Sequence, residues 1–279
     1  MDIKKFEDKV KKTIKKYGLI DKDDRLLVAS SGGKDSTTVL YLLKKFGYKA
    51  EAIFIDLLIG NYSKKNKENL IKFCKENKIK LHIISFRDKF GYSLCYIRDI
   101  LKSKGIKLKS CTICGILKRY LLNMEARRLK ATKLATGHNL DDELQTILMN
   151  FFKGKNEHNA KLGPKIGMIQ DKKFIQRIKP LYFCTVKETE EYSRLMRFPV
   201  IYEKCPCSTD VFRRSIRNGL DEFDDKTKIN AVNNFLKLLP GLKEYYGKKN
   251  KEKLNYCKIC NEPSRNEICS ACKIIRMIE

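Results

Sequence analysis

Residues 29–40 read ASSGGKDSTTVL, and this stretch decides the fold. It overlaps RLLVASS (25–31), an apolar run that predicts a buried strand, and leads into KDSTTVLYLLKKFG (34–47), whose apolar residues recur at helical spacing. The adjacent Gly32 and Gly33 allow a tight turn with inward-facing N–H groups, and the next helix directs the positive end of its dipole at that turn. A strand, loop and helix of this kind are typical of a phosphate-binding site.

The loop matches neither of two familiar phosphate-binding motifs. A Walker A loop requires G-x-x-x-x-G-K followed by Ser or Thr, but here Asp35 follows Lys34, and Val28 stands five positions before Gly33. A dinucleotide fingerprint separates its glycines, whereas these two are adjacent. An acid inside an anion site is explained if Asp35 helps to hold Mg²⁺ or to orient a metal-bound pyrophosphate.

Strands and helices alternate along residues 50–152. Further strands are expected at 50–58, 79–86 and 131–139, and further helices at 63–77, 112–130 and 141–152. This alternation predicts a doubly wound parallel sheet of the α/β class. A basic loop is expected at 153–176, mostly helix at 180–247 and a charged linker at 248–253. The predicted parts are an N-terminal helix (1–20), an α/β domain (21–180), a helical region (181–247) and a cysteine-rich tail (254–279).

The chain is strongly basic. Its 279 residues contain 60 Lys+Arg and 33 Asp+Glu, which gives a formal charge of +27. This excess favours a nucleic-acid partner, because Lys and Arg displace counterions from phosphates; solvated lysine without a partner is the alternative. No apolar run is long enough to span a bilayer, and residues 1–18 read as a charged amphipathic helix instead of a signal peptide. We expect no membrane contact, a cytoplasmic location, and cysteines that are mostly thiols or metal ligands.

The hexapeptide SGGKDS after a buried strand resembles the PP-loop of the N-type ATP pyrophosphatases. In that family the loop holds the β- and γ-phosphates while ATP is split into AMP and pyrophosphate. The resemblance implies ATP and Mg²⁺ as cofactors, bound by Ser31, Gly32, Gly33, Lys34, Asp35 and Ser36. It also implies that Asp56, with Phe54 and Ile55, lies where adenosine is received, and that RIKPL (177–181) lies near the nucleotide.

Two distant sets of cysteines could share one site. Cys111 and Cys114 form a C-x2-C pair at the start of a predicted helix, where the helix dipole and nearby basic residues favour thiolates. Such a pair is a metal site or a redox pair. A metal site needs further ligands, and the segment EKCPCS offers Cys205 and Cys207.

The segments CTICGILKRYLLN (111–123) and TGHNLDDELQT (136–146) resemble the TtuA and TtcA group of tRNA 2-thiolation enzymes, which includes the wobble-uridine thiolases of archaea and eukaryotes. The resemblance covers about residues 20–279. It implies a 4Fe–4S cluster held by Cys111, Cys114 and Cys205, the last because Pro206 follows it; Cys207 is the rival ligand. It makes Lys118 and Asp142 catalytic and places Gly137, His138 and Asp141 beside the nucleotide, with capping of the next helix as the alternative role of Asp141 and Asp142.

The same resemblance implies a reaction and its partners. ATP would adenylate O2 of a uracil or cytosine in tRNA, and a sulfide on the open iron would displace AMP. The sulfur donor would be free sulfide or a thiocarboxylated ubiquitin-like carrier protein, and the family, though nothing in the composition, suggests a homodimer. The alternatives are a cysteine persulfide relay without a cluster, a PP-loop ligase such as a lysidine synthetase, and a non-enzymatic zinc protein that binds RNA.

The tail CKICNEPSRNEICSACK (257–273) predicts a structural zinc site. Its four cysteines, Cys257, Cys260, Cys269 and Cys272, have the C-x2-C-x8-C-x2-C spacing of two knuckles. The thiolation group usually carries a second zinc module before its first helix, and this chain is expected to lack it. A basic helical face formed by Arg213, Arg214 and Arg217 is expected to hold tRNA phosphates, with a solvated surface as the alternative. Cys74, Cys95 and Cys184 are expected in the core.

Overall fold

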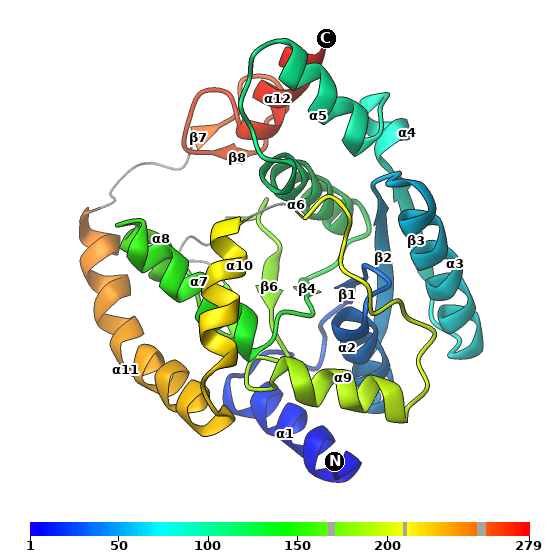
Figure 1. The fold of residues 1–279 in the computed structure, drawn as a ribbon, viewed down its shortest axis with the longest axis vertical. Coiled ribbons are helices and arrows are strands. Elements are labelled where there is room, and N and C mark those ends of the chain that lie inside the picture. Colours follow the sequence, from blue (N-terminus) through cyan, green and yellow to red (C-terminus); the bar gives the residue numbers. More distant parts are fainter. Residues whose placement is uncertain (167–170, 209–210, 250–254) are drawn as a thin grey trace.

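A computed structural model describes residues 1–166, 171–208, 211–249 and 255–279 (Figure 1). Its centre is a six-stranded sheet in the order β3–β2–β1–β4–β6–β5. The strands are β1 (Leu26–Ala29), β2 (Ala50–Asp56), β3 (Leu81–Ser85), β4 (Lys133–Ala135), β5 (Lys165–Ile166) and β6 (Gln176–Ile178). All neighbours pair in parallel except β5, which runs antiparallel to β6. This confirms the predicted doubly wound α/β sheet.

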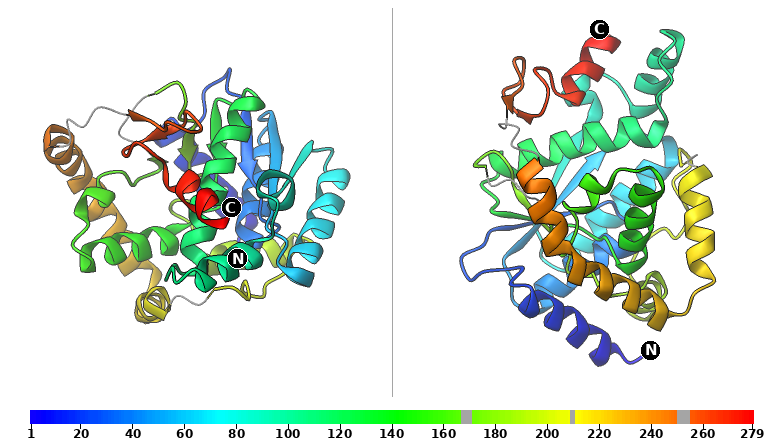
Figure 2. Two further views of the ribbon diagram at one scale, coloured as in Figure 1. Left: turned by 90° about the horizontal axis from the view of Figure 1, so that it is seen from above. Right: turned by 90° about the vertical axis from the view of Figure 1, so that its left-hand side faces the viewer.

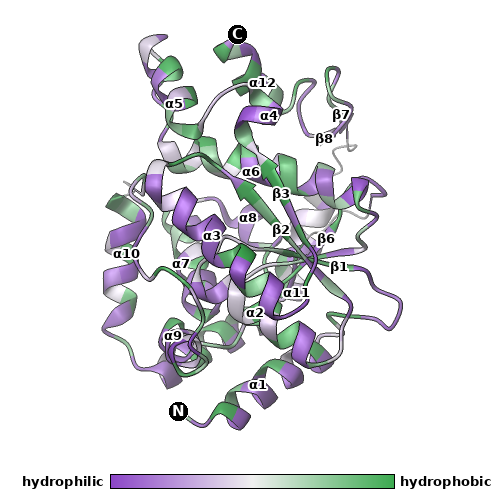
Figure 3. Cartoon of the chain, turned by 90° about the vertical axis from the view of Figure 1, so that its right-hand side faces the viewer, coloured by the Kyte–Doolittle hydropathy of each residue, from purple (hydrophilic) through white to green (hydrophobic). Residues whose placement is uncertain are grey.

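Successive residues of the central strands enter two different cores. On β1, Leu26 and Val28 pack into one hydrophobic core and Leu27 packs into the other. On β2, Phe54 belongs to the first core and Ile55 to the second. Because side chains alternate across a strand, a continuous apolar run means that both faces of the sheet are covered. Figure 3 shows the apolar strands between helices whose outer surfaces are hydrophilic.

Helices pack on each face of the sheet (Figures 1 and 2). The first core is closed by α1 (Ile3–Lys16), α2 (Lys34–Lys45), α3 (Gly60–Glu76) and α9 (Val186–Leu195). The second is closed by α4 (Phe86–Phe90), α5 (Leu94–Ser103), α6 (Ser110–Arg128) and α12 (Ser270–Ile278). A smaller third core joins α7 (Leu140–Phe152), α10 (Val211–Asp221) and α11 (Asp225–Lys249). No helix in the described ranges is long and apolar enough to cross a bilayer.

The largest difference from the sequence prediction is in the expected loop at 153–176. It contains α8 (Asn156–Asn159), the short strand β5 and the start of β6. Strands of two or three residues have no readable periodicity, and they form because the edge of the sheet beside β4 offers unpaired backbone groups. Residues 167–170 of this stretch lie outside the described part, as do residues 250–253 of the predicted linker, whose first two residues end α11.

A buried ion pair ties the sheet to α7. Lys179, just after β6, lies 2.5 Å from Glu143, and both side chains are 3% exposed. Glu143 also accepts a hydrogen bond from Gly163 N–H over 3.0 Å. A buried pair of this kind adds little net stability while intact, but loss of one partner leaves an uncompensated charge.

Lys179→Met should therefore lower the free energy of unfolding by about 3 kcal/mol, measured by denaturant titration. The double variant Glu143→Gln/Lys179→Met should recover part of that loss, because no isolated charge then remains. As a control, Lys248→Met removes an exposed pair with Glu244 and should change the free energy by less than about 0.5 kcal/mol. A single Lys179→Met loss no larger than the control's would contradict this account.

Candidate active site

The phosphate loop joins β1 to α2 and is shaped by its own hydroxyl groups. The Ser31 N–H donates to Ser36 Oγ over 3.0 Å, and Ser36 Oγ donates to the Gly33 carbonyl over 3.1 Å. Gly32 has a φ of +78°, in the left-handed region that favours glycine. A Cβ there would lie 2.7–2.9 Å from three atoms of Asn66 on α3. The tight turn predicted from the two glycines is thus built into the structure.

The loop that follows β4 packs directly on the phosphate loop. A Cβ on Gly137 would lie 2.6 Å from Ser36 N and 2.8 Å from the carbonyl carbon of Asp35, so only glycine fits. Both loops leave the carboxyl ends of neighbouring strands, β1 and β4. The chain first extends the sheet from β1 through β2 to β3 and then returns to the other side of β1. Such a switch point is where doubly wound sheets bind their ligands.

Two carboxylates meet at this point. Lys34 Nζ lies 2.8 and 2.9 Å from the two oxygens of Asp35, and Asn139 Nδ2 donates to Asp35 over 3.2 Å. Asn139 also caps α7 in a reciprocal capping box with Asp142. Burial raises the pKa of Asp35 despite Lys34, and the charge of Asp142 raises it further. Burial likewise raises the pKa of Asp142. Oxygen ligands that are costly to ionise without a cation suit Mg²⁺.

The two distant cysteine sets come together beside α6. Cys111 and Cys114 lie in its first turns, and the segment 196–208 passes next to them (Figure 1). Burial raises the pKa of Cys114; the neighbouring Cys205 and Cys111 raise it further, and Lys118 opposes them. These interactions place the three cysteines predicted as cluster ligands in one neighbourhood, with Lys118 one turn further along α6.

Cys207 has a different environment. Its Sγ lies 3.9 Å from Cys95 Sγ on α5, and its carbonyl lies 3.8 Å from Cys111 Sγ. Cys95, predicted as a core residue, is half-buried and packs against the second core from its margin. Cys74 and Cys184 are buried, as expected.

Cations gather between the cysteines and the phosphate loop. The guanidinium of Arg119 lies over Gly115, 3.0–3.5 Å from where a Cβ would stand. Desolvation by the surrounding protein lowers the pKa of Arg119. Desolvation also lowers the pKa of Arg177 to about 10, and the positive charge of Arg119 contributes to this shift. No carboxylate in the described part of the chain pairs with either side chain. A set of cations without acidic partners is suited to an anionic ligand.

His138 completes this group. Its Nδ1 lies 3.0 Å from Thr136 Oγ1. His138 is exposed at the surface of the site. Even so, the protein on its other sides removes water from the ring, and this desolvation lowers its pKa to about 4, with a smaller effect from the charge of Lys179. Because Arg177 and Lys118 add to the same effect, His138 is neutral at physiological pH and can donate or accept a proton in a hydrogen bond.

Other predicted residues have partners of their own. Asp56 ends β2 as expected, but it is buried and pairs with Lys67 over 2.9 Å. Phe54 and Ile55 are buried in the two cores and do not face this edge, since both faces of β2 are covered. Asp141 is 2.9 Å from Lys228 of α11 and accepts from Val186 N–H over 2.7 Å. It therefore braces α7 against α9 and α11.

The predicted basic face lies on α10. Arg213 and Arg214 are exposed, and Arg217 is half-buried. The position of α10 is fixed by Gln145 of α7, whose Nε2 donates to the Arg213 carbonyl over 2.8 Å. Arg217 and Arg213 both act on Asp142 and lower its pKa against the effect of burial. The basic face thus lies partly toward Asp142, at the edge of the sheet that carries the phosphate loop.

The tail brings its four cysteines together. The Sγ atoms of Cys257, Cys260, Cys269 and Cys272 all lie within 4.8 Å of one another, and those of Cys260 and Cys269 are 3.7 Å apart. Four thiolates at about 2.3 Å from one Zn²⁺ in a tetrahedron would be about 3.8 Å apart, so the arrangement fits zinc. The chain around them forms β7 (Asn255–Tyr256), β8 (Pro263–Ser264) and α12, which packs against α6.

Sequence reasoning missed three features of this site. Asn139, which links Asp35 to the α7 cap, could have been found as an N-cap residue three positions before an acid. The pairing of Cys95 with Cys207 has no sequence signal, because 112 residues separate them. The approach of Arg177 to Arg119 depends on β6. This strand was not predicted, because it has only three residues and forms by pairing with β4.

Comparison with known proteins extends these observations. A family model described as a PP-loop domain matches residues 3–222. A tRNA-5-methyluridine(54) 2-sulfurtransferase of Pyrococcus horikoshii is 38% identical over 272 residues, which cover 96% of this chain and 84% of the relative. The tRNA 2-thiolation protein NcsA of Haloferax volcanii is 29% identical over 292 residues, covering 98% and 90%.

A solved structure is similar over nearly the whole chain. It is the U34-tRNA thiolase NcsA from Methanococcus maripaludis with its 4Fe–4S cluster, and it matches with a TM-score of 0.75 and 28% sequence identity. The match covers 98% of this chain and 87% of that one.

Gly137→Ala should weaken ATP binding at least tenfold, measured by isothermal titration calorimetry. The added methyl group would overlap Ser36 N and displace the phosphate loop. Gly219→Ala on α10 is the matched control, since a Cβ there meets no atom within 4 Å. Equal affinity in the two variants would contradict the close packing of the loops.

His138 should titrate near pH 4, followed by the pH dependence of its ring resonances in NMR and assigned by their loss in His138→Gln. The unfolded chain takes up this proton near the ordinary pKa of 6.5 and the folded protein only near 4. The unfolding free energy from this residue is therefore fully present above pH 6.5 and falls as the pH drops toward 4. A midpoint at or above 6.5 would be inconsistent with this environment.

Proposed function

This chain belongs to the PP-loop family of tRNA 2-thiolation enzymes, and we propose that it is an ATP-dependent tRNA sulfurtransferase that adenylates O2 of a pyrimidine and replaces it with sulfur. The observation that carries the proposal is the grouping of Cys111, Cys114 and Cys205 with Lys118, on the same edge of the sheet as the phosphate loop. Neither feature alone distinguishes a thiolase from other PP-loop enzymes.

The first half of the reaction uses the phosphate loop. The backbone N–H groups at residues 31–36 and the N-terminus of α2 would bind the β- and γ-phosphates of ATP, with Lys34 as a counter-charge. Asp35 fits Mg²⁺, because it brings carboxylate oxygens to the phosphate loop, and burial raises its pKa, so a bound cation would favour its ionised form. The site would hold the base O2 in line with the α-phosphorus, so that the two reacting groups need not meet by diffusion.

In a uracil, the C2 oxygen would be replaced by sulfur in two steps. O2 attacks the α-phosphorus, pyrophosphate leaves and the base loses its N3 proton. Asp142 is suited to accept that proton, since its raised pKa makes it a stronger base than an exposed carboxylate. Sulfur at the sulfide level (HS⁻) then adds to C2, and the C2–O bond breaks as AMP leaves with the original oxygen. The proton carried by the sulfur passes to N3, which restores the N3–H of the 2-thiouracil. Lys118 and the adjacent Arg119 would stabilise the negative charge that develops on the base and on the departing phosphate.

The cysteine group fits a 4Fe–4S cluster bound at three corners. Among the described residues, only the tail cysteines are gathered as closely as the ligands of a single ion, so a larger group than one ion suits Cys111, Cys114 and Cys205. When bound, the cluster would supply a reactive sulfur beside the activated C2. Cys205 is favoured as the third ligand, because it acts directly on Cys114 while the Cys207 thiol lies against Cys95.

The tail would hold one structural Zn²⁺ through Cys257, Cys260, Cys269 and Cys272. Three of these cysteines are buried in the core that covers α6. Zinc would therefore stabilise the helix that presents Cys111 and Cys114. The remaining parts of the proposal are tRNA as the substrate and sulfide or a thiocarboxylated carrier protein as the sulfur donor.

Anaerobic purification should yield about four irons and one zinc per chain, quantified by elemental analysis. Cys111→Ala should lose the iron and keep the zinc, whereas Cys260→Ser should lose the zinc. Cys74→Ala is the control, because its thiol is buried and distant from both sites, and it should keep both metals. Zinc without iron after anaerobic reconstitution would exclude the cluster and favour a persulfide relay.

Activity is tested on unmodified tRNA with ATP and sulfide, followed by mass spectrometry of the digested nucleosides. A 2-thiouridine that depends on ATP and disappears in Lys118→Met supports the proposal. Release of AMP without any thionucleoside would indicate a different PP-loop ligation.

A further inference from the structure

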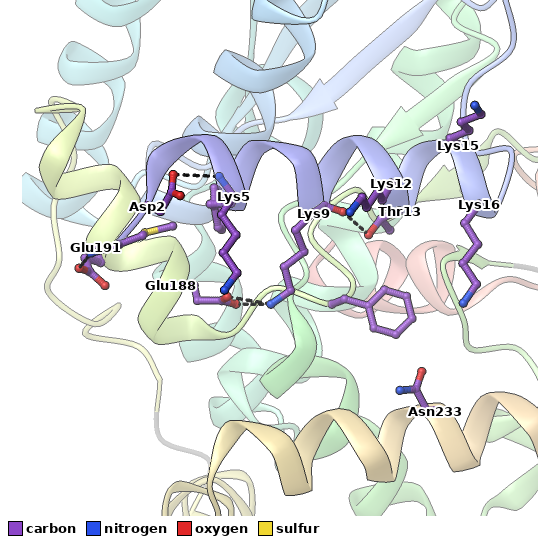
Figure 4. A pocket seen from close by; sticks show the side chains of 13 residues that line it. Asp2, Lys5, Lys9, Lys12, Thr13, Lys15, Lys16, Glu188, Glu191 and Asn233 are labelled. Atoms are coloured by element: carbon purple, nitrogen blue, oxygen red, sulfur yellow. Dashed lines mark hydrogen bonds and ion pairs between the residues drawn. The ribbon is translucent and has the colours of Figure 1, made fainter.

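A groove lies between α1 and α11, away from the active site. Figure 4 shows it with α1 on one side and Asn233 of α11 on the other. Its volume is about 1150 Å³, and its lining includes Thr13 of α1 and Phe183. Nothing in the reaction described above uses this groove.

One stripe of α1 lines the groove with lysines. Lys5, Lys9, Lys12 and Lys16 follow each other at intervals of three or four residues, so they lie on one side of the helix. Eleven residues of helix extend about 16 Å, a length that faces about four or five phosphates of one nucleic-acid strand. The four ammonium groups thus form a row that can run along the phosphates of a strand.

The lysines of this groove outnumber its acids. Five lysines line it, against three carboxylates, those of Asp2, Glu188 and Glu191. The acids are already engaged: Asp2 caps α1, and Glu188 pairs with Lys9 over 2.7 Å. Glu191 pairs with the N-terminal amine. Lys5 and Lys12 are exposed, and no acid in the described ranges pairs with either. An excess of unpaired cations remains for an external anion.

The floor of the groove adds an aromatic surface. Phe183 is half-buried and stacks on Tyr17 with ring centroids 5.7 Å apart. Asn233 and the lysine ammonium groups supply donors around it. Proteins that bind single-stranded nucleic acid combine lysines that contact the phosphates with aromatic rings on which the bases stack.

We propose that the groove between α1 and α11 is a second contact surface for the RNA substrate, binding its sugar–phosphate backbone outside the active site. The inference rests on the proposed function. A short connection joins the two places: Cys184, next to Phe183, accepts a hydrogen bond from Leu140 N–H at the start of α7, beside Asn139 and Asp142. The segment that carries Phe183 thus also packs against the start of α7, next to the active site.

The test compares two triple variants of the full-length protein. Lys5→Gln, Lys12→Gln and Lys16→Gln together remove three charges from the groove and preserve helix propensity. Lys44→Gln, Lys49→Gln and Lys78→Gln remove three exposed lysines from another cavity, at the amino ends of the strands. Binding of unmodified tRNA is measured by fluorescence anisotropy over a salt series, with thermal unfolding as the check on folding.

The groove variant should bind tRNA about tenfold more weakly at low salt. Its plot of log affinity against log salt concentration should be flatter by about two to three units, one for each lost phosphate contact. At saturating tRNA its thiolation rate should match that of the natural protein. The control variant should behave like the natural protein.

Two results would overturn the inference while the proposed function stands. If the natural protein thiolates tRNA and the groove variant binds it as tightly and with the same salt slope, the groove contacts something else, such as an acidic protein partner. If both triple variants lose affinity equally, total charge and not this groove decides binding. Failure of the natural protein to form any 2-thionucleoside is a separate result, and it would refute the proposed function.

Discussion

The contact of Gly137 with the backbone of Asp35 and Ser36 sets the geometry of the whole active site. It locks together the loops that follow β1 and β4, which carry every predicted phosphate contact and the cap of α7. Asn139 then reaches Asp35, and Asp142 takes its place on the first turn of α7. A larger residue at position 137 would push the phosphate loop away from Asn139 and Asp142.

Charge is distributed to suit a reaction between anions. Lys118, Arg119 and Arg177 have no carboxylate partner among the described residues, and protein around them lowers the pKa of both arginines. The same surroundings keep His138 neutral. Phosphates of ATP and of RNA, together with a thiolate-bound cluster, would bring the negative charge that this region lacks. Cations thus exceed acids in the whole chain and also around these residues, and the lysines of α1 form a second basic surface.

The two cysteine groups differ in burial. The tail cysteines are compact and mostly buried, so a metal there would be closed to substrates. Cys111 is exposed, and Cys114 and Cys205 are half-buried, which leaves their site open to a ligand. Since α12 packs on α6, the closed site supports the helix that carries the open one.

The sequence alone determined the class of fold, the phosphate loop and the four-cysteine tail. Each of these is local: a strand, a glycine pair and a helix are contiguous, and C-x2-C knuckles are spaced by a few residues. Only the tertiary structure decided which distant groups meet. Cys205 comes near Cys114, and Cys207 lies against Cys95. Asp141 pairs with Lys228, and Phe54 and Ile55 are buried, because strand order and helix packing fix these neighbours. The short strand β6, which brings Arg177 to Arg119, forms only when β4 is beside it, so no local pattern could have predicted that cationic group.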